Sequence, residues 1–145
     1  MSQPTGFVYG NKELQKKLES LATDGKRNKI ARPAMREASG QIRKAAKAKA
    51  PTLSGSLKKS IKNVVRTGKN GVYAVIGPAA GFATELDGKV NDPLKYAHLV
   101  ENGTTNAPPH PFLRPAFDSI DSEAIIARRM RQELEKEASR GAKKR

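Results

Sequence analysis

The sequence contains no cysteine and no tryptophan, and aromatic residues make up only 5% of its 145 positions. Without cysteine the chain can form neither a disulfide nor a thiolate centre, which fits a reducing compartment. Any hydrophobic core must be built mostly from Ala, Val, Ile and Leu. We therefore expect one domain with a small core, which has extended arms or is completed by neighbouring subunits.

No apolar run in the sequence is long enough to form a membrane-spanning helix. The first ten residues, MSQPTGFVYG, also lack the charged and then apolar order of a secretory signal. We therefore expect a soluble protein that is made in the cytoplasm and does not contact a membrane.

Side chains that could carry chemistry are scarce. The two histidines, His98 and His110, lack the neighbours that a metal site or a nucleophile relay needs. The acidic residues are few and scattered, so no catalytic carboxylate pair stands out. Gly55-Ser56 lacks the lysine of a phosphate-binding loop. We expect no catalytic, metal-binding or cofactor-binding residues, and hence no enzyme.

One acid stands out by its position. Glu101 directly precedes Asn102-Gly103, where a short helix should end. We expect Glu101 to anchor the loop that follows, either by accepting backbone N–H bonds or by pairing with a nearby base. The alternative is an exposed acid on a short helix.

Basic residues outnumber acidic ones by 28 to 14, and the formal net charge is +14. Such a charge implies polyanionic surroundings: nucleic acid, an acidic protein surface or a crowded ring of subunits. The excess is local, because residues 26–62 carry 12 bases and one acid, whereas residues 118–145 carry 8 bases and 6 acids. The basic character therefore belongs to one region of the chain.

Within this basic region the sequence predicts a long helix. It should begin between Asn28 and Pro33, because proline is tolerated in a first turn, and it should end near Ala50. One side of this helix is apolar, and the opposite side is a basic stripe that faces water, an acidic partner or DNA. The apolar side contains Ala31, Met35, Ala38, Ile42 and Ala45. The basic stripe contains Lys29, Arg32, Arg36, Arg43 and Lys47.

The N-terminal residues predict an arm and a first helix. Residues 1–10 should form an extended arm, which is ordered only if another surface covers Phe7 and Tyr9. From Asn11 onward, leucines recur at helical spacing until Asp24-Gly25 stops the pattern.

The middle of the chain predicts a β-hairpin. Val64-Val65 and the run from Val72 to Ile76 are β-branched or aromatic, and they flank a glycine-containing turn at residues 68–71. Residues 79–93 show little pattern and should form a long surface loop. Further on, steps of three and four residues from Phe117 to Leu134 predict a helix that packs against a partner helix.

Residues 96–116 form a stiff connector. Four prolines restrict its backbone, so it should lose little entropy when it docks on the domain itself or on a neighbour. Together with the N-terminal arm it supplies our candidate subunit or partner interface. The candidate residues are Phe7, Tyr9, Pro111, Phe112, Leu113 and Arg114.

Three strings in order resemble a known family. APTLSGSLKKSI, ending at Ile61, resembles the signature APxxTGxLRxSI of tailed-bacteriophage tail-component proteins, which complete the tail or join it to the head. YAHLVENGT from Tyr96 resembles that family's YAxxVEFGT, and PHPFLRPA from Pro109 resembles its PAxPFLRPA. Two positions depart from the pattern: Ser54 replaces threonine and Asn102 replaces an aromatic residue.

The resemblance implies an α+β fold, in which a small antiparallel sheet is packed by the long helix of the first half and by the C-terminal helix. Residues 11–138 would be a single domain between the arm and a basic tail at residues 139–145. The resemblance further implies a structural virion protein, assembled in the host cytoplasm, that forms a homo-oligomeric ring of six at the neck. Its partners would be connector or head-completion proteins, tail tube or tail terminator proteins, and the DNA in the lumen.

The charge alone supports a second hypothesis, a free protein that binds duplex DNA. Such a protein would bind DNA as an isolated monomer with a steep dependence on salt. For the ring protein, an acidic protein partner for Arg32, Arg36, Arg43 and Lys47 is favoured over DNA, because tight DNA contacts would hinder transit.

Overall fold

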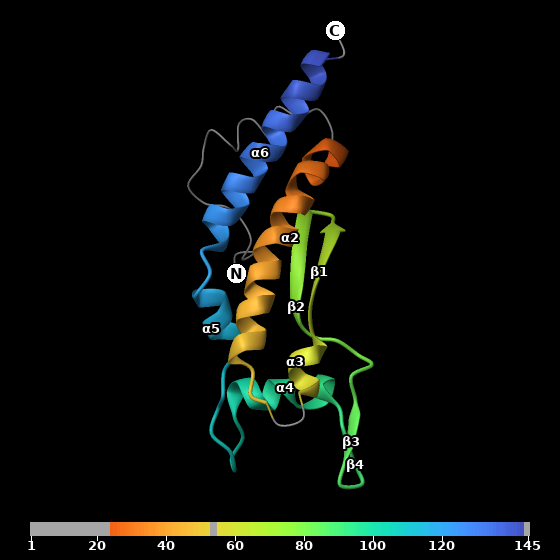
Figure 1. Ribbon diagram of the computed structural model, residues 1–145, viewed down its shortest axis with the longest axis vertical. Coiled ribbons are helices and arrows are strands. Elements are labelled where there is room, and N and C mark those ends of the chain that lie inside the picture. The colour runs from red at the N-terminus through yellow and green to blue at the C-terminus, as the bar shows by residue number, and fades with distance from the viewer. Residues whose placement is uncertain (1–23, 53–54, 144–145) are drawn as a thin grey trace. The chain divides into compact units, whose positions relative to one another are not determined.

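The computed structural model describes residues 24–52 and 55–143, and the fold is α+β as predicted (Figure 1). The predicted N-terminal arm with Phe7 and Tyr9, and the helix predicted from Asn11, lie outside the described residues. The helices are α2 (Asp24–Lys49), α3 (Ser56–Ser60), α4 (Pro93–Asn102), α5 (Leu113–Asp118) and α6 (Ser122–Lys143). The strands are β1 (Ile61–Gly68), β2 (Gly71–Pro78), β3 (Thr84–Leu86) and β4 (Lys89–Asn91).

The described residues form two compact units. Unit 1 contains residues 24–38, 65–74 and 121–143, and unit 2 contains residues 39–64 and 75–120 within the described ranges. None of the described helices is long and apolar enough to cross a membrane.

The core of unit 1 lies between the N-terminal part of α2 and α6. Ile30 and Ala34 of α2 and Met130 of α6 are buried there, and half-buried side chains of α6 such as Leu134 pack around them. The small side chains of α2 allow a close approach of the two helices. The apolar residues of α6 therefore pack against another helix, α2, as the sequence predicts.

Charged pairs flank this helix contact. Glu37 accepts a hydrogen bond from Arg128 at 2.6 Å, and Lys29 lies 3.5 Å from Glu137. These side chains are substantially exposed, so each pair adds little stability.

The core of unit 2 is built around Phe112, which is fully buried. The C-terminal part of α2 supplies Ile42 and Ala46, and Ala50, just after the helix, and Ile61 pack with them. The remaining buried members of this cluster are Leu57, Ala97 and Ala116.

Helix α2 begins at Asp24, so the predicted start between Asn28 and Pro33 is wrong, and Pro33 lies inside the helix. An interior proline removes one backbone hydrogen bond and costs about 3 kcal/mol. Ile30 and Ala34 are buried on either side of Pro33, and burial of these residues against α6 offsets that cost. The C-terminal end of α2 at Lys49 agrees with the predicted stop before Pro51.

The predicted hairpin is present as β1 and β2, which form a two-stranded sheet. The loop predicted for residues 79–93 is wrong in part, because β3 and β4 form a second antiparallel hairpin there. Asp87 and Gly88 connect these strands with φ angles of 52° and 72°. Positive φ at both central residues is the geometry of a type I′ turn, which Asp-Gly sequences favour.

The helix predicted from Phe117 to Leu134 is interrupted. Helix α5 ends at Asp118 and α6 begins at Ser122. Asp121 caps the start of α6, because its Oδ1 accepts a hydrogen bond from the N–H of Ala124 at 3.1 Å. This cap starts a new helix after the break. Helix α6 then extends to Lys143 and includes much of the predicted tail.

Candidate functional site

Helix α4 positions Glu101 at its last turn. Asp92 caps the start of α4 by accepting a hydrogen bond from the N–H of Leu94 at 3.1 Å, and Pro93 occupies the first helical position. Ala97 is buried in the core of unit 2, and Glu101 follows it one helical turn later on the same side. The carboxylate is therefore brought to the edge of the core rather than into solvent.

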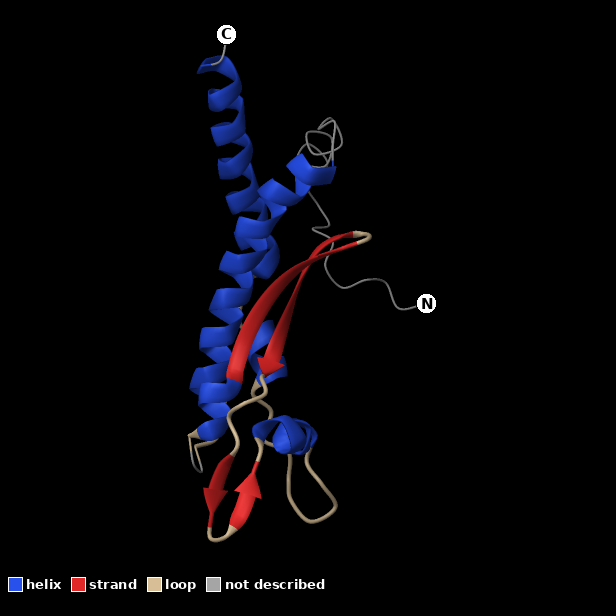
Figure 2. Ribbon diagram, turned by 90° about the vertical axis from the view of Figure 1, so that its right-hand side faces the viewer, coloured by secondary structure: helices blue, strands red, loops and turns tan. Residues whose placement is uncertain are grey.

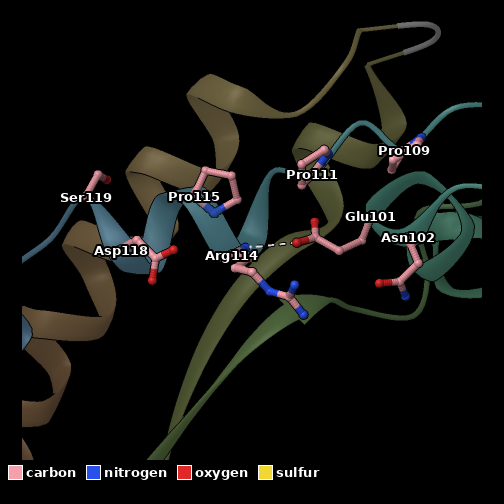
Figure 3. Close-up of a pocket in the computed structure, with 8 residues that line it drawn as sticks. All are labelled: Glu101, Asn102, Pro109, Pro111, Arg114, Pro115, Asp118 and Ser119. Carbon is pink, nitrogen blue, oxygen red and sulfur yellow. Dashed lines mark hydrogen bonds between the residues drawn. The ribbon is translucent and has the colours of Figure 1, made fainter.

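The Glu101 carboxylate binds the start of α5 (Figure 3). Its Oε2 accepts hydrogen bonds from the N–H groups of Phe112 at 2.8 Å and Leu113 at 3.0 Å, and its Oε1 accepts one from Arg114 at 2.9 Å. The first N–H groups of a helix have no partner within the helix. Glu101 thus caps α5 from a distant part of the chain, which is the loop-anchoring geometry expected of a backbone-bonded acid.

These bonds also set the charge state of Glu101. Partial burial alone would raise the pKa of its carboxyl. The N–H bonds from Phe112, Leu113 and Arg114, with the positive charge of Arg114, outweigh burial and hold the pKa below its ordinary value of 4.5. The anchor is therefore a carboxylate at neutral pH.

Gly103 makes the turn that follows α4. Its N–H donates to the carbonyl oxygen of Leu99 at 2.8 Å, and its φ is +75°. A Cβ atom at this position would lie 2.7 Å from the backbone nitrogen of Pro109 and 2.9 Å from its Cδ. Only glycine fits both the conformation and the space.

Residues 103–111, here called the proline loop, are closed at several points. The N–H of Thr104 donates to the carbonyl of Ala107 at 2.8 Å, and the N–H of His110 donates to the carbonyl of Val100 at 2.8 Å. Apart from Gly103, every residue of the loop is exposed. The loop is therefore a preorganised surface element, fixed by Gly103 at one end and by Glu101 at the other.

The candidate interface residues of the connector have different environments. Phe112 is fully buried in the core of unit 2, so it holds the connector to its own domain, which is one of the two alternatives expected for it. Leu113 is half-buried, whereas Pro111 and Arg114 are exposed.

Pro111 and Arg114 line an open depression of about 680 Å³. The depression is mainly a surface of proline rings with the Arg114 and Asp118 side chains at its edge (Figure 3). Its other lining residues are Glu101, Asn102, Pro109, Pro115 and Ser119.

The predicted basic stripe is divided between the two units. In unit 1, Arg36 is exposed, and Arg32 donates a hydrogen bond from Nη1 to Oγ1 of Thr67 on β1 at 2.9 Å. In unit 2, Arg43 and Lys47 are half-buried. The Nε of Arg43 is shielded from solvent and has no hydrogen-bond partner.

Two features of this surface were missed from the sequence. The sequence predicts only a helix stop at Gly103, whereas the close approach of Gly103 to Pro109 also makes it part of the proline loop. The β3–β4 hairpin lies where the sequence analysis predicts a loop, although Asp87-Gly88 is a hairpin signal. Among the described residues, no group of three or more His, Cys, Asp or Glu side chains could hold a metal ion.

Residues 12–103 match the sequence model of a family whose description reads "Bacteriophage HK97-gp10, putative tail-component". The match covers the described elements from α2 to α4 and ends at the first residue of the proline loop. No curated protein matches the chain. No solved structure matches it either.

Proposed function

Because the chain belongs to the HK97-gp10-like family of bacteriophage tail components, we propose that it forms a ring at the head–tail junction of a tailed phage. In this position it completes the tail or joins it to the connector, and the ring surrounds the DNA conduit. A ring of six copies follows from the family resemblance. The protein acts as a structural component of the virion and carries out its function through contacts.

The observation that carries this proposal is the preorganised proline loop. Three hydrogen bonds to the Glu101 carboxylate fix its end, and Gly103 fixes its start. An exposed loop that is already ordered loses little entropy when it binds a partner. At the tip of the loop, Thr105 and Pro108 are exposed and so are accessible to a partner.

Apolar surface lies beside this loop. Leu94 and Leu99 on α4 are 50% and 43% exposed. The β3–β4 hairpin and the proline loop project from opposite ends of α4 toward the same side (Figures 1 and 2). Exposed apolar side chains next to an ordered loop can contribute to an interaction site. We assign the proline loop and the exposed side chains of α4 to the adjoining connector, head-completion, tail tube or tail terminator protein.

Particles test this proposal directly. Mass spectrometry of purified virions should detect the chain, and electron microscopy of particles made without it should show heads and tails that are unjoined. Supplying the wild-type chain in trans should restore joining. Complete, infectious particles formed in its absence would refute the proposed role.

Binding to duplex DNA by the isolated chain is the second candidate, favoured by the basic side chains of α2. It predicts binding by the monomer that weakens steeply with salt. Gel-shift measurements at two salt concentrations distinguish the two functions, because the virion protein should bind DNA weakly in isolation.

A further inference from the structure

The β3–β4 hairpin has little to support it within its own chain. The side chains of β3 are all exposed, and on β4 Val90 is 75% exposed. The sheet has only these two strands, so among the described residues neither of its edges is paired. An isolated two-stranded hairpin is marginally stable in water. A partner surface is therefore expected to cover it.

The charge of the hairpin identifies the partner. Residues 84–92 carry Glu85, Asp87 and Asp92 against a single lysine, so this segment is acidic in a chain whose formal net charge is +14. Asp92 is engaged as the cap of α4. The side chains of Glu85, in the middle of β3, and of Asp87, in the turn, are exposed and make no hydrogen bond or ion pair in the described part of the chain.

The complementary surface lies on α2 in unit 2. Residues 39–49 carry Arg43, Lys44, Lys47 and Lys49 and no acid. None of these four bases has an ion pair in the structure as described. Arg43 is the most constrained, because its Nε is buried without a hydrogen-bond partner. The burial of Nε holds the guanidinium in place, and its exposed part can accept a facing carboxylate without further ordering.

We propose that the β3–β4 hairpin of one copy docks on the Arg43 and Lys47 side of α2 in the next copy. The inference rests on the proposed ring, for which it supplies the contact between copies. The two surfaces are different parts of the same chain, so the contact is head-to-tail and can repeat around a closed ring. Glu85 and Asp87 meet the bases, while Leu86 and Val90 bury apolar surface at the contact.

Charge exchange in the full-length protein tests this contact. Glu85→Lys with Asp87→Lys should weaken self-association at least about tenfold, because like charges then face each other across the contact. Arg43→Glu with Lys47→Glu should do the same. A 1:1 mixture of the two double variants should associate again, since each hairpin then meets a stripe of opposite charge on the other variant. Sedimentation velocity at low and high salt measures the self-association of the two double variants and of their mixture.

A matched control is available on α6. Glu123→Lys with Glu135→Lys makes the same change in net charge at two exposed acids outside the proposed contact. This variant should associate like the wild type. Circular dichroism checks that every variant is folded. Equal weakening in the control variant, or a mixture that stays dissociated, would overturn the inference. So would a wild-type chain that remains monomeric at low salt, or an Arg43/Lys47 variant that loses only DNA binding.

The inference and the proposed function can fail separately. If the chain is found in virions but the hairpin variant associates and is incorporated like the wild type, the contact is wrong and the ring protein stands. If the charge-exchanged pair associates as expected but virions lack the chain, the contact stands and the proposed function is wrong.

Discussion

Glu101→Gln removes the charge that binds the first N–H groups of α5 while keeping the size of the side chain. In the wild type the carboxylate accepts three hydrogen bonds, at 2.8, 3.0 and 2.9 Å. The glutamine amide has one acceptor oxygen, and its NH2 group would face an N–H donor. Hydrogen bonds to a charged group contribute roughly 1.5–3 kcal/mol each, and partial exposure of Glu101 reduces this. We expect a loss of about 2 kcal/mol in the free energy of unfolding.

Urea unfolding at neutral pH measures this loss. The midpoint should fall while the slope with urea stays unchanged, because the substitution alters stability and not the surface exposed on unfolding. Glu135→Gln, which changes an exposed acid on α6 outside the proposed contact between copies, serves as the control and should shift the midpoint little. A loss below about 0.5 kcal/mol for Glu101→Gln would show that the carboxylate does not hold the loop.

The pH dependence checks the electrostatic origin. The pKa of Glu101 in the folded state lies below its ordinary value of 4.5. A depressed pKa contributes stability that is fully present above the unfolded pKa and is lost as the pH falls through the folded pKa. The difference between wild type and Glu101→Gln should therefore be constant near neutral pH and shrink below about pH 4. A difference that does not change with pH would attribute the effect to shape alone.

Three further substitutions test the fold around the site, each by urea unfolding. Gly103→Ala should cost at least about 2 kcal/mol, because a Cβ meets Pro109 at 2.7 Å and φ is positive; a neutral result would mean that the loop can shift. Phe112→Ala should cost about 3–5 kcal/mol, because the ring is fully buried; a cost below about 1 kcal/mol would contradict its place in the core. Pro33→Ala should stabilise the protein by about 1–3 kcal/mol, because it restores a helix hydrogen bond. Destabilisation would show that the packing of the proline side chain contributes more than that hydrogen bond.

Local patterns in the sequence were sufficient for the elements whose stability is local. The apolar spacing predicts most of α6 but not the break between Asp118 and Ser122, and the glycine-flanked turn predicts the hairpin of β1 and β2. The stop of α2 before Pro51 is local as well, since proline disfavours helix in the residue before it. Asp87-Gly88 is also a local signal, and it was sufficient to predict the turn between β3 and β4.

Tertiary contacts decided the rest. Pro33 is tolerated inside α2 because Ile30 and Ala34 are buried on both sides of it, and burial against another element is invisible in a local pattern. Phe112 reads equally well as an interface anchor or as a core residue, and only the fold buries it.

The site divides in the same way. Sequence by itself determined that Glu101 ends a short helix before a glycine, and that the chain carries an excess of positive charge. The folded chain decided that the carboxylate reaches N–H groups 11 to 13 residues further on, and that Gly103 lies against Pro109. A side chain and its distant partner are brought together by packing of whole elements, and the energy of that packing depends on every residue in the core.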